Sequence, residues 1–257
     1  AISLASPAGA FEIFGLKFFE STDADVEVID PLNYTVTLTV EPAPGNEDGS
    51  LEDALRTASG LIGDEEKPVS GSLGLLSKAK TDRKRLVAAL FEQARYDGLV
   101  DVFIEGRDIT TLQPDATFSA RPVPVTIRVR PGPKYTLGRI AVSSGGIPVD
   151  PAEYGLEAGG DAGSAKVLEA EAKMFNALRE DGRPFVAVTG RDIIADAATD
   201  RLEYQAALDP GPRVPFGDVY VEGAKDVDPG FIAYMTGLKA GEVFSPQELA
   251  DARARLL

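Results

Sequence analysis

The chain has 257 residues, with 26 Lys plus Arg against 41 Asp plus Glu, and therefore a formal net charge of −15. This acidity disfavours nucleic-acid binding, which needs a basic surface to neutralise phosphates. The sequence has no Cys, His or Trp, which excludes Ser-His-Asp and Cys-His catalysis, thiol nucleophiles, iron–sulfur clusters and most zinc or haem sites. No run approaches the roughly 18 apolar residues of a membrane-spanning helix.

Residues 1–32 are expected to form an N-terminal arm. Ala8, Gly9 and Ala10 fit a small-x-small cleavage site, so residues 1–10 are interpreted either as a signal-peptide remnant or as an unordered terminus. Residues 11–19 are rich in Phe. They predict an extended arm that packs on the first module or binds a partner.

The first module is predicted over residues 33–133. Apolar residues alternate with Thr from Tyr34 to Glu41, which predicts a strand with one buried face. A Gly- and Ser-rich connection is expected over residues 63–77. The other expected elements are helices over Leu51–Ile62 and from about Asp82 to a stop at Asp97-Gly98, then strands over Val100–Ile109 and Val123–Arg130.

The second module, over residues 134–212, repeats this order. Its expected elements are a strand over Tyr135–Ser143, a helix starting at Asp150-Pro151, a second helix ending at Gly182, and strands over Phe185–Ile194 and Arg201–Leu208. The third module, over residues 213–257, begins with a strand predicted over Gly217–Glu222 and a short helix after Pro229. Ser245-Pro246-Gln247-Glu248 is a capping box that predicts another helix start. Both closing strands are expected to be missing, so this copy is interpreted as incomplete.

Internal repeats support this division. The stretch Pro131-Gly132-Pro133 and the alternation that follows it recur at Pro210-Gly211-Pro212. Asp97-Gly98, near the end of the first module's second helix, recurs as Asp181-Gly182. A motif that returns in the same order along the chain indicates consecutive copies of one small unit.

Two further motifs recur with a change in their separation. Asp150-Pro151 returns as Asp228-Pro229, and Gly155-Leu156 returns as Gly237-Leu238. The interval between the two motifs is longer in the later copy by about one helical turn. The first helix is therefore predicted to be one turn longer in the third copy.

A tandem βααββ unit with such Pro-Gly stops resembles the polypeptide-transport-associated (POTRA) domain of outer-membrane protein assembly factors. The resemblance covers about residues 33–257 and is strongest to the TamA branch of the family, the barrel subunits of the translocation and assembly module; BamA, with five POTRA domains, matches less well. It implies an α+β fold of tandem POTRA domains. Each would have a three-stranded mixed sheet and two helices on one face.

The resemblance also implies a function without catalysis and without a cofactor. The chain would lie in the periplasm of a Gram-negative bacterium, attached to the outer membrane through a C-terminal β-barrel that this sequence does not contain. The implied partners are a TamB-like inner-membrane protein, unfolded outer-membrane protein or autotransporter clients, and the chain's own barrel. Three alternatives stay open: a client-binding module, a passive spacer between the two membranes, and an unrecognised enzyme.

The implied binding mechanism is strand addition, in which an extended client completes the hydrogen bonds of an open sheet edge. In this fold the strand after the second helix lies at the edge, so the candidates are the strands over Val100–Ile109 and residues 186–194. Side chains there either contact a partner or protect the edge from aggregation. The candidate partner-binding residues are Val102, Phe103, Ile104, Arg107, Val186, Val188 and Arg191. The predicted hinge residues are Pro131, Gly132, Pro133, Pro210, Gly211 and Pro212.

Two acidic segments have weak metal-binding features. Asp23, Asp25 and Glu27 have calcium-like spacing but lack the turn glycine and the distal glutamate of a calcium loop. Residues 46–48, with Glu52 and Asp53, form a second carboxylate cluster. Both are interpreted as solvated acidic loops, and no metal site is predicted.

Overall fold

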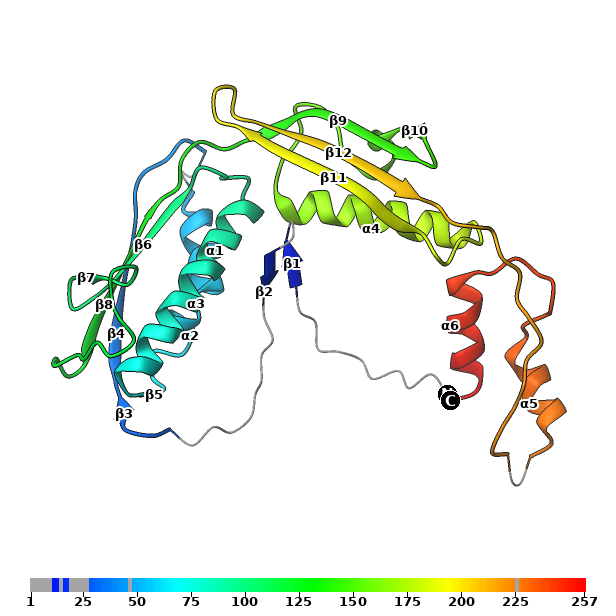
Figure 1. Cartoon of the computed structure of the whole chain (residues 1–257), viewed down its shortest axis with the longest axis horizontal. Coiled ribbons are helices and arrows are strands. Elements are labelled where there is room, and N and C mark those ends of the chain that lie inside the picture. The colour runs from blue at the N-terminus through cyan, green and yellow to red at the C-terminus, as the bar shows by residue number, and fades with distance from the viewer. Residues whose placement is uncertain (1–10, 14–15, 19–27, 46–47, 225–226) are drawn as a thin grey trace. The chain divides into compact units, whose positions relative to one another are not determined.

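The computed structural model describes residues 11–13, 16–18, 28–45, 48–224 and 227–257, so the proposed signal remnant and the first acidic segment lie outside the described residues. The chain forms two compact units. Of the described residues, unit 1 contains those up to 136 together with 161–165 and 195–201, and unit 2 contains the rest. The expected boundaries of the three modules stay predictions. Figure 1 labels the elements of both units.

In the N-terminal arm two short strands pair with each other. They are β1 (Phe11–Ile13) and β2 (Leu16–Phe18), and they run antiparallel. A second small pair consists of β3 (Pro31–Leu32) and β5 (Val69–Ser70), also antiparallel.

The helices of unit 1 differ from those expected. The helix predicted over Leu51–Ile62 is divided into α1 (Ser50–Ala58) and α2 (Gly60–Gly63), so the prediction of one helix is wrong. The break lies at Ser59, whose hydroxyl oxygen accepts the Ile62 N–H at 3.1 Å and donates to Asp82 at 2.7 Å. This buried side-chain bond offers the backbone an alternative to a continuous helix.

Helix α3 (Gly71–Glu92) begins eleven residues before the expected start at Asp82. The connection predicted over residues 63–77 is therefore wrong for its second half. Leu75, Leu76 and Ala79 are all buried in the core of unit 1. Their burial stabilises the helix enough to outweigh the poor helix propensity of Gly71 and Gly74.

The sheet of unit 1 has four strands in the order β4-β8-β6-β7. They are β4 (Tyr34–Val40), β8 (Val123–Arg130), β6 (Leu99–Ile104) and β7 (Arg107–Asp108). β4 runs parallel to β8 and β6 runs antiparallel to it, with Val102 opposite Ile127. Alternate residues of β6 and β8 are buried, and the Thr residues of β4 face away from the core, as the sequence predicts.

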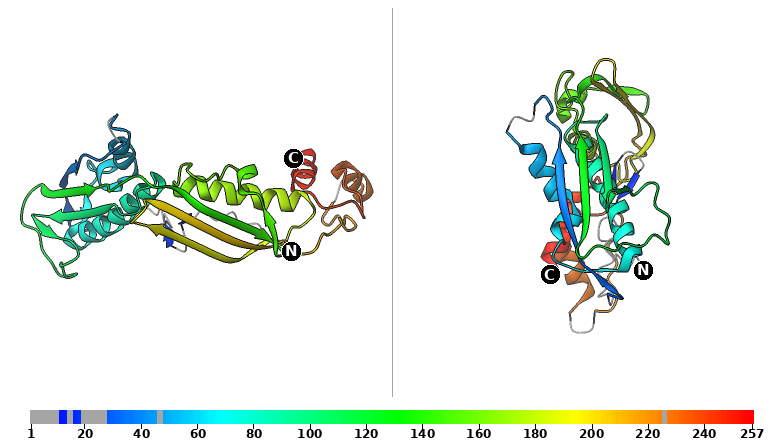
Figure 2. Two further views of the ribbon diagram at one scale, coloured as in Figure 1. Left: turned by 90° about the horizontal axis from the view of Figure 1, so that it is seen from above. Right: turned by 90° about the vertical axis from the view of Figure 1, so that its left-hand side faces the viewer.

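The sheet of unit 2 has the order β10-β9-β12-β11. The strands are β9 (Thr136–Ser144), β10 (Ile147–Val149), β11 (Ala187–Asp196) and β12 (Arg201–Asp209). Helix α4 (Ser164–Glu180) follows one face of this sheet (Figure 1). The first predicted helix is a single 3₁₀ turn, η1 (Pro151–Tyr154). Viewed from above, the long strands lie side by side (Figure 2). Both sheets are thus mixed, and each has one short strand beyond the expected three.

The third copy contributes two helices, α5 (Pro229–Thr236) and α6 (Pro246–Arg255). The predicted cap at Ser245 is confirmed, because its hydroxyl accepts the Glu248 N–H, and at the start of α5 the Asp228 carboxylate accepts the Phe231 N–H. α5 has eight residues against four in η1, which confirms the extra turn. The strand predicted over Gly217–Glu222 is wrong, because no described strand lies beside this segment to supply ladder hydrogen bonds.

The second helix of both modules ends in the same motif, with a residue in the left-handed conformation. In α3 this residue is Ala94, with φ 58°, and in α4 it is Gly182, with φ 83°. The next N–H, of Arg95 or Arg183, bonds back to the carbonyl five residues earlier, at 2.8 and 3.1 Å. This is a Schellman cap. The prediction that Asp97-Gly98 ends the first of these helices is therefore wrong, whereas Gly182 is confirmed for the second.

The same two arginines hold the Pro-Gly-Pro stops. The Arg95 guanidinium donates to the Gly132 carbonyl at 2.6 Å, and the Arg183 guanidinium donates to the Gly211 carbonyl at 2.8 Å. Both glycines have a left-handed φ, 68° and 64°. The predicted hinges are thus bonded segments within their own units; whether they bend stays a prediction.

Candidate strand-addition edges

The first predicted edge, Val100–Ile109, is a hairpin and not one strand. β6 turns at Glu105 and Gly106, both with positive φ, into β7, which pairs with Phe103 and Ile104. The Ile109 N–H also donates to the Val102 carbonyl at 3.1 Å. The expectation of an open flank along this whole segment is therefore wrong, because the chain's own backbone occupies the edge at residues 102–104.

The side chains predicted to contact a partner at this edge have partners within unit 1. Val102 and Ile104 are buried in the core. The Arg128 guanidinium carbon lies 5.0 Å from the Phe103 ring centroid, so Arg128 covers part of the ring. Phe103 is half-buried and not fully exposed. Arg107 donates to the Thr117 carbonyl at 2.7 Å. A role of these residues in partner binding stays a prediction.

The second predicted edge is the open one. β11 is the last strand of the sheet in unit 2, and among the described strands β12 is its one neighbour. It has ten residues and begins at Ala187, one residue after the buried Val186. Val188 is half-buried and Ile194 is 47% exposed. β11 therefore offers a long row of backbone N–H and C=O groups to an added strand.

Arg191 connects this edge strand to the helix beneath it. Its guanidinium forms an ion pair with the Glu171 carboxylate of α4, and Glu171 is only 5% exposed. The Tyr204 hydroxyl of β12 donates to the same carboxylate at 3.2 Å. Burial, then the nearby Glu171 charge, raises the pKa of Tyr204 above its ordinary value, so the phenol stays a donor. These three residues join β11, β12 and α4.

The sequence reasoning missed Glu171 and Tyr204. A signal for Glu171 exists, because it lies four residues after Val167 and three before Met174, within the apolar stripe of α4. A carboxylate at such a position requires a buried partner. The sequence does not say which of the arginines supplies it.

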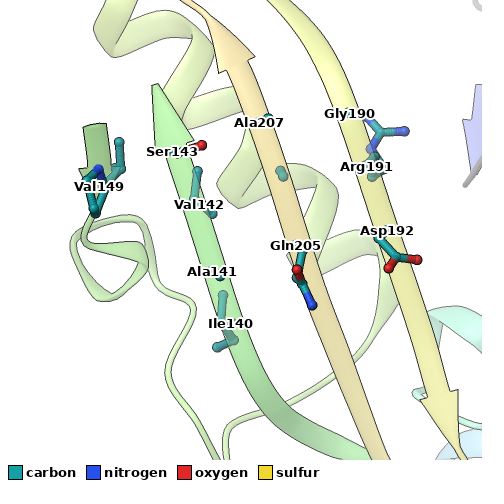
Figure 3. A pocket seen from close by; sticks show the side chains of 12 residues that line it. Ile140, Ala141, Val142, Ser143, Val149, Gly190, Arg191, Asp192, Gln205 and Ala207 are labelled. Carbon is teal, nitrogen blue, oxygen red and sulfur yellow. The ribbon is translucent and has the colours of Figure 1, made fainter. Parts of the chain in front are cut away.

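A shallow hollow lies on the sheet of unit 2 and reaches the β11 edge. Its volume is about 700 Å³. Figure 3 shows Gly190, Arg191 and Asp192 of β11 along one border, with Gln205 and Ala207 of β12 between them and β9. The arrowheads of β9 and β12 point the same way and that of β11 points the opposite way (Figure 3).

A polar pocket in unit 1 has a structural explanation. Asp82, buried in α3, accepts hydrogen bonds from the Ser59 hydroxyl and from the N–H groups of Gly60 and Leu61. Burial raises the pKa of Asp82, although these hydrogen bonds oppose the rise. The carboxylate thus satisfies the backbone between α1 and α2. No group of three or more potential metal ligands occurs in the described part of the chain.

None of the described helices is long and apolar enough to cross a membrane. The chain matches no protein-family model and no curated protein sequence. Its structure is similar to the crystal structure of Haemophilus influenzae BamA POTRA3-5, with a TM-score of 0.54 and 15% identity, over 88% of this chain and 85% of that one. The fold is that of POTRA domains.

A further similar structure is POTRA1-2 of the periplasmic domain of Omp85 from Anabaena, with a TM-score of 0.41 and 12% identity, over 71% of this chain and 96% of that one. The likeness to BamA POTRA3-5 confirms the expected fold class of tandem α+β POTRA domains. The preference for the TamA branch stays a prediction.

Proposed function

We propose that this chain is the periplasmic POTRA region of an outer-membrane protein assembly or translocation factor that binds extended segments by strand addition to β11. The similarity of this fold to that of BamA POTRA3-5 supports the proposal. The observation that carries the mechanism is the position of β11, a ten-residue strand at the end of its sheet order. Main-chain hydrogen bonds to such an edge are largely independent of client sequence.

The proposal includes the finer assignments. The chain would belong to the TamA branch, attached to the outer membrane through a C-terminal barrel and acting with a TamB-like inner-membrane protein. Its clients would be unfolded outer-membrane proteins or autotransporters. The three repeat copies and the Phe-rich N-terminal arm support this branch. The function is binding and not catalysis.

Proline substitution of neighbouring residues tests strand addition. Successive N–H groups of a strand point to opposite edges of that strand. One of the two variants Val188→Pro and Thr189→Pro therefore removes a hydrogen bond to β12, and the other removes only a donor at the free edge. The edge-facing variant is recognised because its thermal unfolding stays close to that of the parent chain. Val188→Ala and Thr189→Ala control for loss of the side chains.

The ligand is a fluorescein-labelled decapeptide in which threonine alternates with valine, N-methylated at alternate residues so that only one edge can pair. In fluorescence anisotropy, the edge-facing proline variant is expected to bind about two- to tenfold more weakly, the range of one lost hydrogen bond. A fully N-methylated peptide has no donor and should not bind. Unchanged binding by the well-folded edge-facing proline variant would refute strand addition at β11 and favour a passive spacer.

A further inference from the structure

The edge strand β11 carries side-chain information as well as backbone groups. We propose that it selects extended segments with a bulky apolar residue, best an aromatic one, opposite Gly190 and a Lys or Arg two positions away, opposite Asp192. This inference rests on the proposed strand addition and names the chemistry of the segment that binds there.

The backbone at Gly190 does not require glycine. Its φ lies outside the left-handed region. A Cβ atom built at Gly190 meets only the Ala207 Cβ, at 3.9 Å, which is ordinary contact. Any residue would therefore fit, and glycine in a strand interior is otherwise unfavourable because it provides no side chain to pack. Glycine at such a position is typical of a site where another group approaches closely.

The hollow of about 700 Å³ extends from this point across the sheet. Its lining includes Gly190, Ala207 and Ser143, none of which has a side chain large enough to fill it. An aromatic residue on an added strand reaches both the directly opposite residue and the diagonal ones. Its ring would cover Gly190 and enter the hollow beside Ala207. There the ring would bury its own apolar surface against the part of the sheet that the small side chains leave uncovered.

The charge preference comes from Asp192. It is exposed, and it lies two residues from Gly190 and therefore on the same face of β11. Within the described residues its carboxylate forms no ion pair, since the neighbouring Arg191 is bonded to Glu171 of α4. A cation opposite Asp192 would pair with it, and like charge would be repelled. The net charge of −15 also favours the binding of a basic segment over that of an acidic one.

Thiol tethering tests the side-chain preference in a fixed register. The chain has no cysteine, so Ile194→Cys provides a single thiol on the face of Gly190 and Asp192. Four peptides place Phe or Ala opposite Gly190 and Lys or Glu opposite Asp192, each with a cysteine opposite residue 194. Both sequence orders are made, because an added strand can run in either direction. Binding is measured as the fraction of protein that forms a mixed disulfide with the peptide in a glutathione buffer. The peptides are then compared in the sequence order that gives the larger fraction.

We expect the peptide with Phe and Lys to form the most mixed disulfide. Replacing Phe by Ala, or Lys by Glu, should each lower the extent of tethering about two- to fivefold, the range of a favourable cross-strand pair. Gly190→Val should remove the preference for Phe, and Gly190→Ala should reduce it. Asp192→Lys should invert the preference between Lys and Glu. Gly217→Val and Asp218→Lys are matched controls on exposed residues of unit 2 outside β11 and should leave both preferences unchanged.

The remaining outcomes separate the two levels of the proposal. Equal tethering of all four peptides, with none by their fully N-methylated versions, would overturn the side-chain inference and leave strand addition in place. Tethering of the fully N-methylated peptides as strong as that of the others would refute strand addition at β11 itself, and the inference with it.

Discussion

Removing the Arg191 guanidinium should destabilise unit 2 strongly, because it leaves a carboxylate without its ion-pair partner inside the sheet–helix interface. Glu171 is 5% exposed, and among the described residues its partners are Arg191 and the Tyr204 hydroxyl. Breaking a fully buried pair costs about 3–5 kcal/mol. The Arg191 side chain is 31% exposed and Tyr204 remains a donor, so for Arg191→Ala we expect a loss of about 2–3 kcal/mol in the free energy of unfolding.

Urea unfolding followed by circular dichroism measures this loss. The matched control is Arg139→Ala, which breaks the ion pair of Arg139 with Glu203 at 3.0 Å in the same sheet. The Arg139 side chain is 67% exposed, so this change should cost at most about 1 kcal/mol. Replacing both Glu171 and Arg191 by leucine should cost less than Arg191→Ala alone, since no buried charge then remains. A loss for Arg191→Ala no greater than that for Arg139→Ala would refute this reasoning.

Further predictions concern the helix ends and the buried Asp82. Ala94→Gly should stabilise unit 1 by up to about 1 kcal/mol, because Ala94 has a left-handed φ that favours glycine. Gly182→Ala should destabilise unit 2 by at least about 1–2 kcal/mol, because Gly182 has a left-handed φ and an added Cβ would also clash with Val243. A change of the same sign in the thermal unfolding of both variants would contradict this. Because burial raises the pKa of Asp82, the folded state holds its proton more tightly than the unfolded state. The free energy of unfolding that Asp82 contributes should therefore increase as pH falls through the range just above about 4. Urea titrations at several pH values should show this contribution as the difference from Asp82→Asn, and parallel pH profiles of the two proteins would refute it.

The open edge illustrates how far the sequence leads. The resemblance placed two candidate edges, because in that fold the strand after the second helix lies at the edge of the sheet, and both of these strands carry Gly-Arg-Asp-Ile. The structure distinguishes them. In unit 1 the turn at Glu105 and Gly106 folds β7 back onto β6, whereas in unit 2 the corresponding residues continue as the ten-residue β11. A local motif does not say whether the next residues turn or extend, because this depends on what they pair with.

The helix ends show the same division. The motif Asp-Gly suggested an equivalence of Asp97-Gly98 with Asp181-Gly182. The hydrogen bonds instead make Ala94 equivalent to Gly182, because the carbonyls of these two residues accept the N–H of Tyr135 and of Val214, four residues beyond the first proline of each stop. Identity of residue type indicated the repeat. Only the bonding pattern decided its register.

By itself, the sequence determined the features that depend on local periodicity and chain stiffness: the alternating strands β4 and β8, the caps at Asp150 and Ser245, and the repeated Pro-Gly-Pro stops. The tertiary structure decided which edge is open and which arginine pairs with Glu171. These features depend on residues far apart in the chain. Their free energy comes from burial and pairing, which no short window of sequence contains.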